Sequence, residues 1–218
     1  TRSARRFALD LRRAEATVEL TRGAVRGVFS ATDSVALFTV PGLREVRIVR
    51  PASLNQLGYA PATLGSDGPD SLRFRWMEQR TIDGLRYVVA VGTRTHDTLT
   101  TIAITIATSV DGSAPLTIAR GRVARALRQG YTNLSARHVE WWGRYWRSVA
   151  SLTVPDSALQ AHLDLVQYLY GAAARRGTPA IPLQGVWTAD GNSLPPWKGD
   201  IHNDLNTQMT YLAAHASG

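Results

Sequence analysis

The chain has 218 residues, of which 44% are hydrophobic and 19% are charged, a balance typical of globular domains with a sizeable core. Its formal net charge is +8, and Lys198 is the only lysine among 25 basic residues. The arginines are scattered rather than clustered, which argues against a nucleic-acid-binding surface. The apolar runs are far too short to cross a membrane. The absence of cysteine excludes disulfides and thiolate metal sites.

The chain begins with Thr1 rather than Met and stops at Gly218 within a helical pattern, so we expect an internal piece of a longer protein. Arginine in place of lysine, with abundant alanine, fits a GC-rich bacterial genome. An exported protein, periplasmic or secreted, is the working hypothesis for its location. The sequence leaves the oligomeric state open.

Up to residue 118, apolar and polar residues alternate in short runs, the period expected of β-strands. Breakers such as Gly65 to Pro69 separate the runs, and Asp83-Gly84 is typical of a hairpin turn. The predicted strands are 7–11, 17–20, 24–30, 35–40, 45–51, 73–79, 87–95 and 100–108. Many short strands with such turns predict a β-sandwich, and residues 1–118 are expected to be part of an N-terminal domain of this kind.

From residue 119 the apolar positions recur at spacings of three and four, the period of a helix. Residues 119–150 are predicted to form a helical linker that breaks at Gly130. Its second part carries four large aromatic residues, Trp141, Trp142, Tyr145 and Trp146. Two roles are open for these rings, namely sugar binding and packing between domains. Packing is favoured, because a helix between two domains needs apolar anchors on both sides.

Residues 151–218 are expected to begin a separate helical domain. Asp156 stands before a helical pattern, where it predicts an N-terminal cap. Residues 177–200 form a long loop rich in Pro and Gly, and loops of this length in compact domains are usually functional or disordered. A last helix is predicted to begin at Asn203 or Asp204.

Residues 181–211 crowd polar side chains and tryptophans together. Indole rings cover the apolar face of a sugar ring, while carboxylates and amides bind its hydroxyls. We therefore expect an oligosaccharide or glycoconjugate as the substrate. The candidate residues are Gln184, Trp187, Asn192, Trp197, Asp200, His202, Asn203, Asp204, Asn206 and Gln208.

Helix geometry limits how Asp204 and Asn206 can cooperate. Within a regular helix they would lie roughly 200° apart, so they share a pocket only if Asp204 precedes the helix and Asn206 lies in its first turn. The competing interpretation is that Asp204 only caps the helix and that His202 is a core histidine. The spacing of Asp200, His202 and Asp204 matches no zinc pattern, so we expect neither a metal nor a cofactor.

Three motifs of this segment resemble, in order, the start of the catalytic domain of glycoside hydrolase family 95. That family comprises inverting α-L-fucosidases and relatives that act on other sugars. The motifs are Leu183-Gln184-Gly185-Val186-Trp187, then Pro195-Pro196-Trp197, then Asn203 to Tyr211. The strand Arg5-Arg6-Phe7-Ala8-Leu9-Asp10-Leu11 and the Trp141-Trp142 pair agree with the same family. The resemblance covers nearly the whole chain and is strongest over residues 181–211.

The resemblance implies a sandwich followed by an (α/α)6 six-hairpin barrel, of which residues 151–218 are a truncated start. In the family, two asparagines and a downstream aspartate position the attacking water, and a downstream glutamate is the general acid. Asn206 matches the second asparagine and Asp204 replaces the first, so these two are the catalytic candidates. A carboxylate at position 204 is able to bind a sugar hydroxyl or to act as the base, which weakens the case for fucose. The substrate-binding candidates are Trp187, Trp197, Asp200, His202, Asn203 and Gln208.

Inverting hydrolysis needs a second carboxylate about 6.5–9.5 Å from the first. Glu140 has the character of a surface charge, so we expect the acid to lie beyond Gly218 and this piece alone to be inactive. Two alternatives stay open. One is a glycoside phosphorylase or another exo-glycosidase of the same architecture. The other is a non-catalytic carbohydrate-binding or scaffold module.

Overall fold

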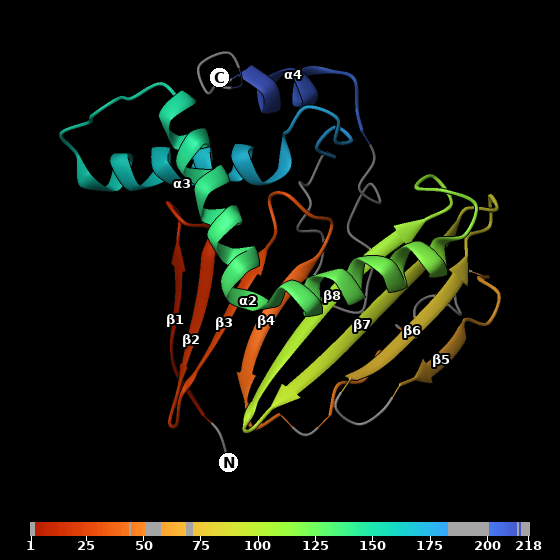
Figure 1. The fold of residues 1–218 in the computed structure, drawn as a ribbon. Helices are drawn as coiled ribbons and strands as arrows, with labels where there is room; N and C mark the ends of the chain where they lie inside the picture. Colours follow the sequence, from red (N-terminus) through yellow and green to blue (C-terminus); the bar gives the residue numbers. More distant parts are fainter. Residues whose placement is uncertain are drawn as a thin grey trace. The chain divides into compact units, whose positions relative to one another are not determined.

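The computed structural model describes residues 3–43, 45–50, 58–68, 72–182, 201–212 and 214 (Figure 1). The chain divides into two compact units. The first unit comprises Thr1–Asp10 and Ala14–Val139, and the second comprises Leu11–Arg13 and Glu140–Gly218. The domain limits suggested by the sequence, at residues 118 and 150, stay a prediction.

The first unit contains one antiparallel sheet of eight strands in the order β1-β2-β3-β4-β8-β7-β6-β5. The expected fold class, β-structure followed by helices, is confirmed. The strand bounds are Ala4–Asp10 (β1), Glu15–Leu20 (β2), Ala24–Phe29 (β3), Ala36–Pro41 (β4), Thr63–Asp67 (β5), Leu72–Arg80 (β6), Arg86–His96 (β7) and Leu99–Thr108 (β8).

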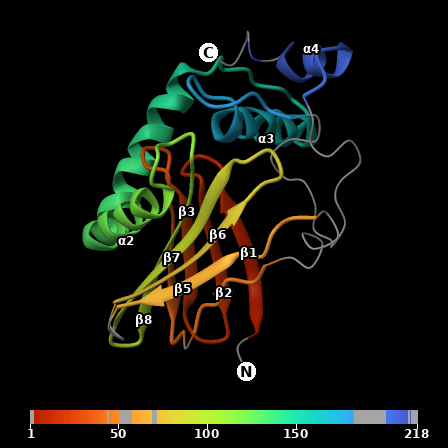
Figure 2. The same ribbon diagram turned by 90° about the vertical axis from the view of Figure 1, so that its right-hand side faces the viewer.

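One face of the sheet packs against helix α2, which spans Pro115–Ser148 and lies to one side of the sheet in Figure 2. Leu37, Ala90 and Ala103 on the sheet form a core with Val123 and Leu127 of the helix. The alternation of the strands produces this core, because every second residue points to the helix.

Part of the opposite face of the sheet is apolar and exposed, whereas Arg75 and the buried Gln79 of β6 lie on the same face and contact residues 45–50. Phe7, Phe29 and Ile106 lie on this face by the register of the strands, and their side chains are 76%, 76% and 59% exposed. An apolar sheet face of this kind is what one layer of a sandwich presents to the other.

Two sequence predictions within the sheet are wrong. Residues 45–50 of the predicted strand 45–51 are not a strand, and residue 51 lies outside the described residues. This segment is held by side chains of β6 rather than by backbone hydrogen bonds to a neighbouring strand. Arg75 pairs with Glu45 at 3.2 Å, and Arg50 Nε donates to Gln79 Oε1 at 3.0 Å.

The second wrong prediction is that residues 65–67 belong to a break between strands, because Thr63–Asp67 form β5. A Cβ atom at position 65 would lie only 2.0 Å from the indole of Trp76 on β6. Gly65 is therefore a strand residue over which a tryptophan packs, rather than a turn residue.

Helix α2 bends at Gly130, as predicted. Gly130 has φ 75° and ψ 166°, a backbone conformation essentially reserved for glycine. The residues before and after it keep the helical conformation, so the single glycine produces the bend.

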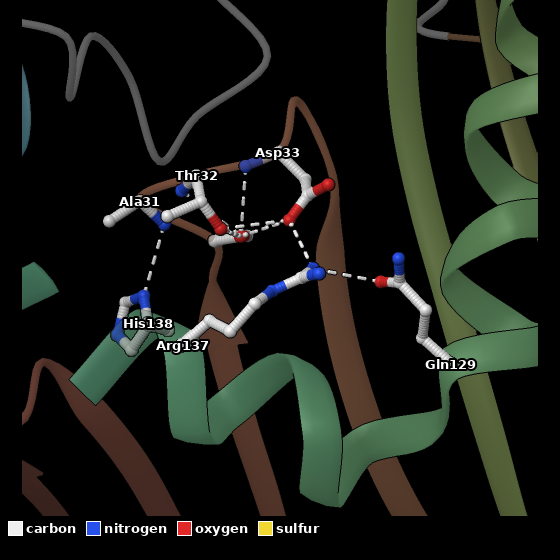
Figure 3. A network of polar contacts seen from close by, with 7 residues as sticks. Ala31, Thr32, Asp33, Gln129, Arg137 and His138 are labelled. Carbon is white, nitrogen blue, oxygen red and sulfur yellow. Dashed lines mark hydrogen bonds and ion pairs between the residues drawn. The ribbon is translucent and has the colours of Figure 1, made fainter. Parts of the chain in front are cut away.

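Beyond the bend, His138 connects α2 to the sheet (Figure 3). Its side chain is 1% exposed, and Ala31 N donates to its Nδ1 at 3.1 Å. Its Nε2 therefore carries the proton and donates to Ala14 O at 3.1 Å. Next to it, Arg137 donates to Asp33 in the same loop as Ala31 at 2.9 Å. His138 is a satisfied structural histidine.

The second unit holds the end of α2, helix α3 (Ser157–Ala173) and helix α4 (Leu205–Tyr211). Asp156 caps α3 as predicted, accepting from Ala158 N at 2.8 Å and Leu159 N at 3.0 Å. Trp142 of α2 is 3% exposed, and its ring stacks on Tyr168 of α3 at 5.2 Å. These contacts have the character of packing.

Candidate functional site

The structure describes five of the eight predicted site residues, namely His202, Asn203, Asp204, Asn206 and Gln208. Trp187, Trp197 and Asp200 lie outside the described residues. The geometry of the candidate site therefore rests on the start of α4.

Asp204 is the N-cap of α4. Its backbone is extended, with φ −133° and ψ −159°, and its Oδ1 accepts from Asn206 N at 3.1 Å. Its carbonyl oxygen accepts the first helical hydrogen bond, from Gln208 N at 3.1 Å. The geometric condition for Asp204 and Asn206 to cooperate is met, since one precedes the helix and the other lies in its first turn.

Polar contacts of three neighbouring side chains fix the position of α4. Thr207 Oγ1 donates to His202 O, and Tyr170 OH on α3 donates to Thr210 O. Ile181 N donates to Tyr211 OH at 2.5 Å. The hydroxyls of Thr207, Tyr170 and Tyr211 are positioning groups that sequence reasoning missed, because their partners are backbone atoms that no sequence pattern identifies.

The first turn of α4 faces outward in this chain. Asp204, Asn206 and Gln208 are exposed and His202 is half-buried. Leu205 and Met209, on the same short helix, are 67% and 59% exposed. A short helix with polar and apolar side chains both exposed offers a surface for further structure or for substrate.

This arrangement has the chemistry of a polar binding site. One oxygen of Asp204 accepts the cap bond, and a carboxylate has further acceptor capacity on its second oxygen. The carboxamide of Asn206, two residues on, offers both donors and an acceptor. Together they are suited to hold a water molecule or a sugar hydroxyl.

In the ranges that the structure describes, no three His, Cys, Asp or Glu side chains gather where they could hold a metal ion. Within the same ranges, no helix has the length and hydropathy to span a bilayer.

The other carboxylates described in the second unit each have a structural partner. Glu140 accepts from Arg144 Nη1 at 2.5 Å, Asp156 caps α3, and Asp164 accepts from Gln160 Nε2 at 3.1 Å. Asp204 also has a structural partner as the cap of α4, and Asn206 and Gln208 follow it at the start of that helix.

Comparisons with known proteins agree with the motifs. Residues 132–218 match the glycosyl hydrolase family 95 catalytic domain. A segment of 55 residues is 36% identical to "Probable alpha-fucosidase A" of Aspergillus niger and covers 25% of this chain. The resemblance to family 95 is confirmed over the matched residues.

A solved structure named "Putative kojibiose phosphorylase from human microbiome" superposes with a TM-score of 0.60 over 84% of this chain. At 12% sequence identity this likeness shows the fold alone. The chain spans 7% of the length of the fucosidase and 29% of the phosphorylase chain.

Proposed function

Since residues 132–218 match the family 95 catalytic domain, we propose that the protein hydrolyses glycosidic bonds and inverts the anomeric centre. In this proposal residues 151–218 begin an (α/α)6 barrel, and the start of α4 forms part of its active site. The family match carries the proposal, and the position of Asp204 and Asn206 at the start of α4 supports it.

In this proposal Asp204 and Asn206 bind and activate the attacking water molecule. An inverting glycosidase activates a water molecule on the face of the sugar opposite the leaving group. Asp204 accepts a proton or a hydrogen bond from this water, and the Asn206 side chain orients it. The cap bond from Asn206 N fixes the Asp204 carboxylate at 3.1 Å, so the base is held before the substrate arrives.

The general acid comes from a part of the protein outside residues 1–218. It must stand about 6.5–9.5 Å from the base to leave room for water. Glu140 and Asp156 have structural roles, and Asp164 already accepts from Gln160 and lies near Arg12, which supports a source elsewhere. This chain alone is then inactive.

The substrate is an oligosaccharide or glycoconjugate, an α-L-fucoside or a related sugar. Asp204 replaces an asparagine of the family pattern, so it adds a negative charge where fucosidases of the family have an amide. This charge favours a sugar that presents an additional hydroxyl donor there. The residues proposed to bind the sugar are Trp187, Trp197, Asp200, His202, Asn203 and Gln208.

The test is hydrolysis by the full-length protein. Aryl α-L-fucosides, α-galactosides and other aryl glycosides are incubated with and without phosphate, and the anomer released is followed by proton NMR. We expect release of a free sugar of inverted configuration, independent of phosphate. Strict dependence on phosphate would identify a phosphorylase, and turnover of no glycoside by a folded full-length protein would refute the proposal.

A further inference from the structure

A cavity of about 340 Å³ lies in the second unit beside the start of α3. Its walls are the end of α2, residues 149–153, three residues of α3 between 160 and 167, and Arg12 from the turn between β1 and β2. None of residues 202–208 lines it, so it is separate from the candidate catalytic residues. Its volume falls within the range of about 300–1,000 Å³ typical of small-ligand sites.

A stripe of three polar side chains on α3 forms one wall. Gln160, Asp164 and Gln167 repeat at spacings of four and three, which places them on one helix face. Gln160 accepts from Val154 N at 2.9 Å and donates to Asp164 Oδ1 at 3.1 Å. Gln167 Nε2 donates to Ala150 O at 3.2 Å. The hydrogen bonds hold this wall in place, so ligand binding needs little ordering of side chains.

A guanidinium and an indole lie together beside this wall. Arg12 Nη2 lies 3.6 Å from Asp164 Oδ2, and its guanidinium carbon lies 4.2 Å from the ring centroid of Trp146. Trp146 Nε1 donates to Leu11 O at 3.1 Å, which fixes the turn that carries Arg12.

The charges of Arg12 and Asp164 offset each other, which favours a neutral ligand over an ionic one. Their 3.6 Å separation exceeds the about 2.7–2.9 Å of a tight charged hydrogen bond. A guanidinium has five N–H donors and a carboxylate has about four acceptor sites, so one ligand hydroxyl can donate to the carboxylate while a neighbouring hydroxyl accepts from the guanidinium. Adjacent hydroxyls of this kind are the defining feature of a sugar ring.

We propose that this cavity is a second, non-catalytic binding site for a neutral sugar residue. Asp164 and Arg12 hold two adjacent hydroxyls, Gln167 holds a third polar group, and Trp146 with Leu152, which is 62% exposed, supplies the apolar part of the wall. The choice of a carbohydrate among neutral polyhydroxylated ligands rests on the proposed function. In that setting the site holds a remote part of an oligosaccharide whose other end is cleaved.

The test compares Asp164→Asn with wild type in the full-length protein. The substitution keeps the shape of the side chain and removes its charge. His162→Asn is the matched control, since His162 is exposed, lies two residues from both Gln160 and Asp164, and does not line the cavity. Binding of methyl α-L-fucopyranoside and methyl β-D-galactopyranoside is measured by ligand-observed NMR, and turnover is measured on an aryl glycoside and on an oligosaccharide.

We expect Asp164→Asn to weaken binding of at least one methyl glycoside about tenfold or more, the usual effect of losing one charged hydrogen bond. The KM for the oligosaccharide should rise, while kcat on the aryl glycoside and the unfolding midpoint should stay at the wild-type values. His162→Asn should match wild type throughout.

Unchanged binding and an unchanged oligosaccharide KM in Asp164→Asn would overturn the second site and leave the proposed hydrolysis standing. Loss of binding together with a lower unfolding midpoint would also overturn the second site, because Asp164 would then stabilise the fold rather than bind the ligand. Absence of all hydrolysis, with binding that still depends on Asp164, would instead refute the proposed function and retain the site.

Discussion

A close contact between α2 and α3 allows a sharp prediction about the packing of the second unit. A Cβ atom at Gly171 would lie 2.6 Å from Tyr145 Cε1 and 2.8 Å from Trp142 Cζ3. Trp142 is 3% exposed, so its ring cannot move aside without disturbing its neighbours. Gly143, a helical glycine of the same unit, would place its Cβ no closer than 3.5 Å to the end of the exposed Arg147 side chain.

The same substitution should therefore have opposite effects at the two positions. Gly143→Ala gains about 0.5–1 kcal/mol from helix propensity alone. Gly171→Ala has the same gain, but overpacking costs about 1–3 kcal/mol, so we expect a net loss of about 1 kcal/mol.

Urea unfolding of the full-length protein measures both effects, with tryptophan fluorescence reporting on the rings of α2 beside Gly171. We expect the transition to move to lower urea for Gly171→Ala and to higher urea for Gly143→Ala. Equal shifts at the two positions, or a more stable Gly171→Ala, would show that α3 does not pack on Trp142 and Tyr145 as described.

Four further substitutions test other parts of the structure. His138→Leu leaves the Ala31 N–H donor and the Ala14 carbonyl acceptor without partners, so it should destabilise the first unit by about 2 kcal/mol or more. Arg137→Ala removes only the exposed ion pair with Asp33 and should cost about 1 kcal/mol at most. Chemical denaturation of both variants measures the difference. The hydrogen bond from Arg122 lowers the pKa of Asp111, so this pair stabilises the fold above pH 4 and the benefit disappears as the pH falls through the lowered value. Unfolding curves between pH 7 and pH 2 should then converge for wild type and Asp111→Asn, and parallel curves would contradict this linkage. Asp156→Ala removes the cap of α3 and should cost about 0.5–2 kcal/mol in thermal unfolding without changing turnover.

Local rules predicted much of the fold because local chemistry decides those features. The caps at Asp156 and Asp204 and the bend at Gly130 follow from side-chain oxygens near helix starts and from one glycine conformation. Alternation located most strands correctly, because one face of the sheet is buried against α2.

The failures arose where a distant residue decides the local structure. Gly65 is part of a strand because Trp76 packs over it, and residues 45–50 are held by Arg75 and Gln79 instead of by a neighbouring strand. Neither partner can be identified from the segment itself.

The candidate sites show the same division. The start of α4 was predicted from its own residues, since Asp204 and Asn206 lie within one turn. The cavity beside α3 depends on Arg12, which lies more than one hundred residues away in the sequence from Trp146 and Asp164. The polar stripe of Gln160, Asp164 and Gln167 was the one signal available beforehand.

The charge of Asp204 offers the most direct test of the proposed active site. Asn caps a helix about as well as Asp, so Asp204→Asn removes the charge and preserves the start of α4. In the full-length protein we expect kcat on the best glycoside to fall about 100-fold or more, as for loss of a general base, with the unfolding midpoint unchanged. The matched cap variant Asp156→Asn should keep wild-type turnover. Wild-type turnover in Asp204→Asn would contradict the account, since Asp204 would then be only a helix cap.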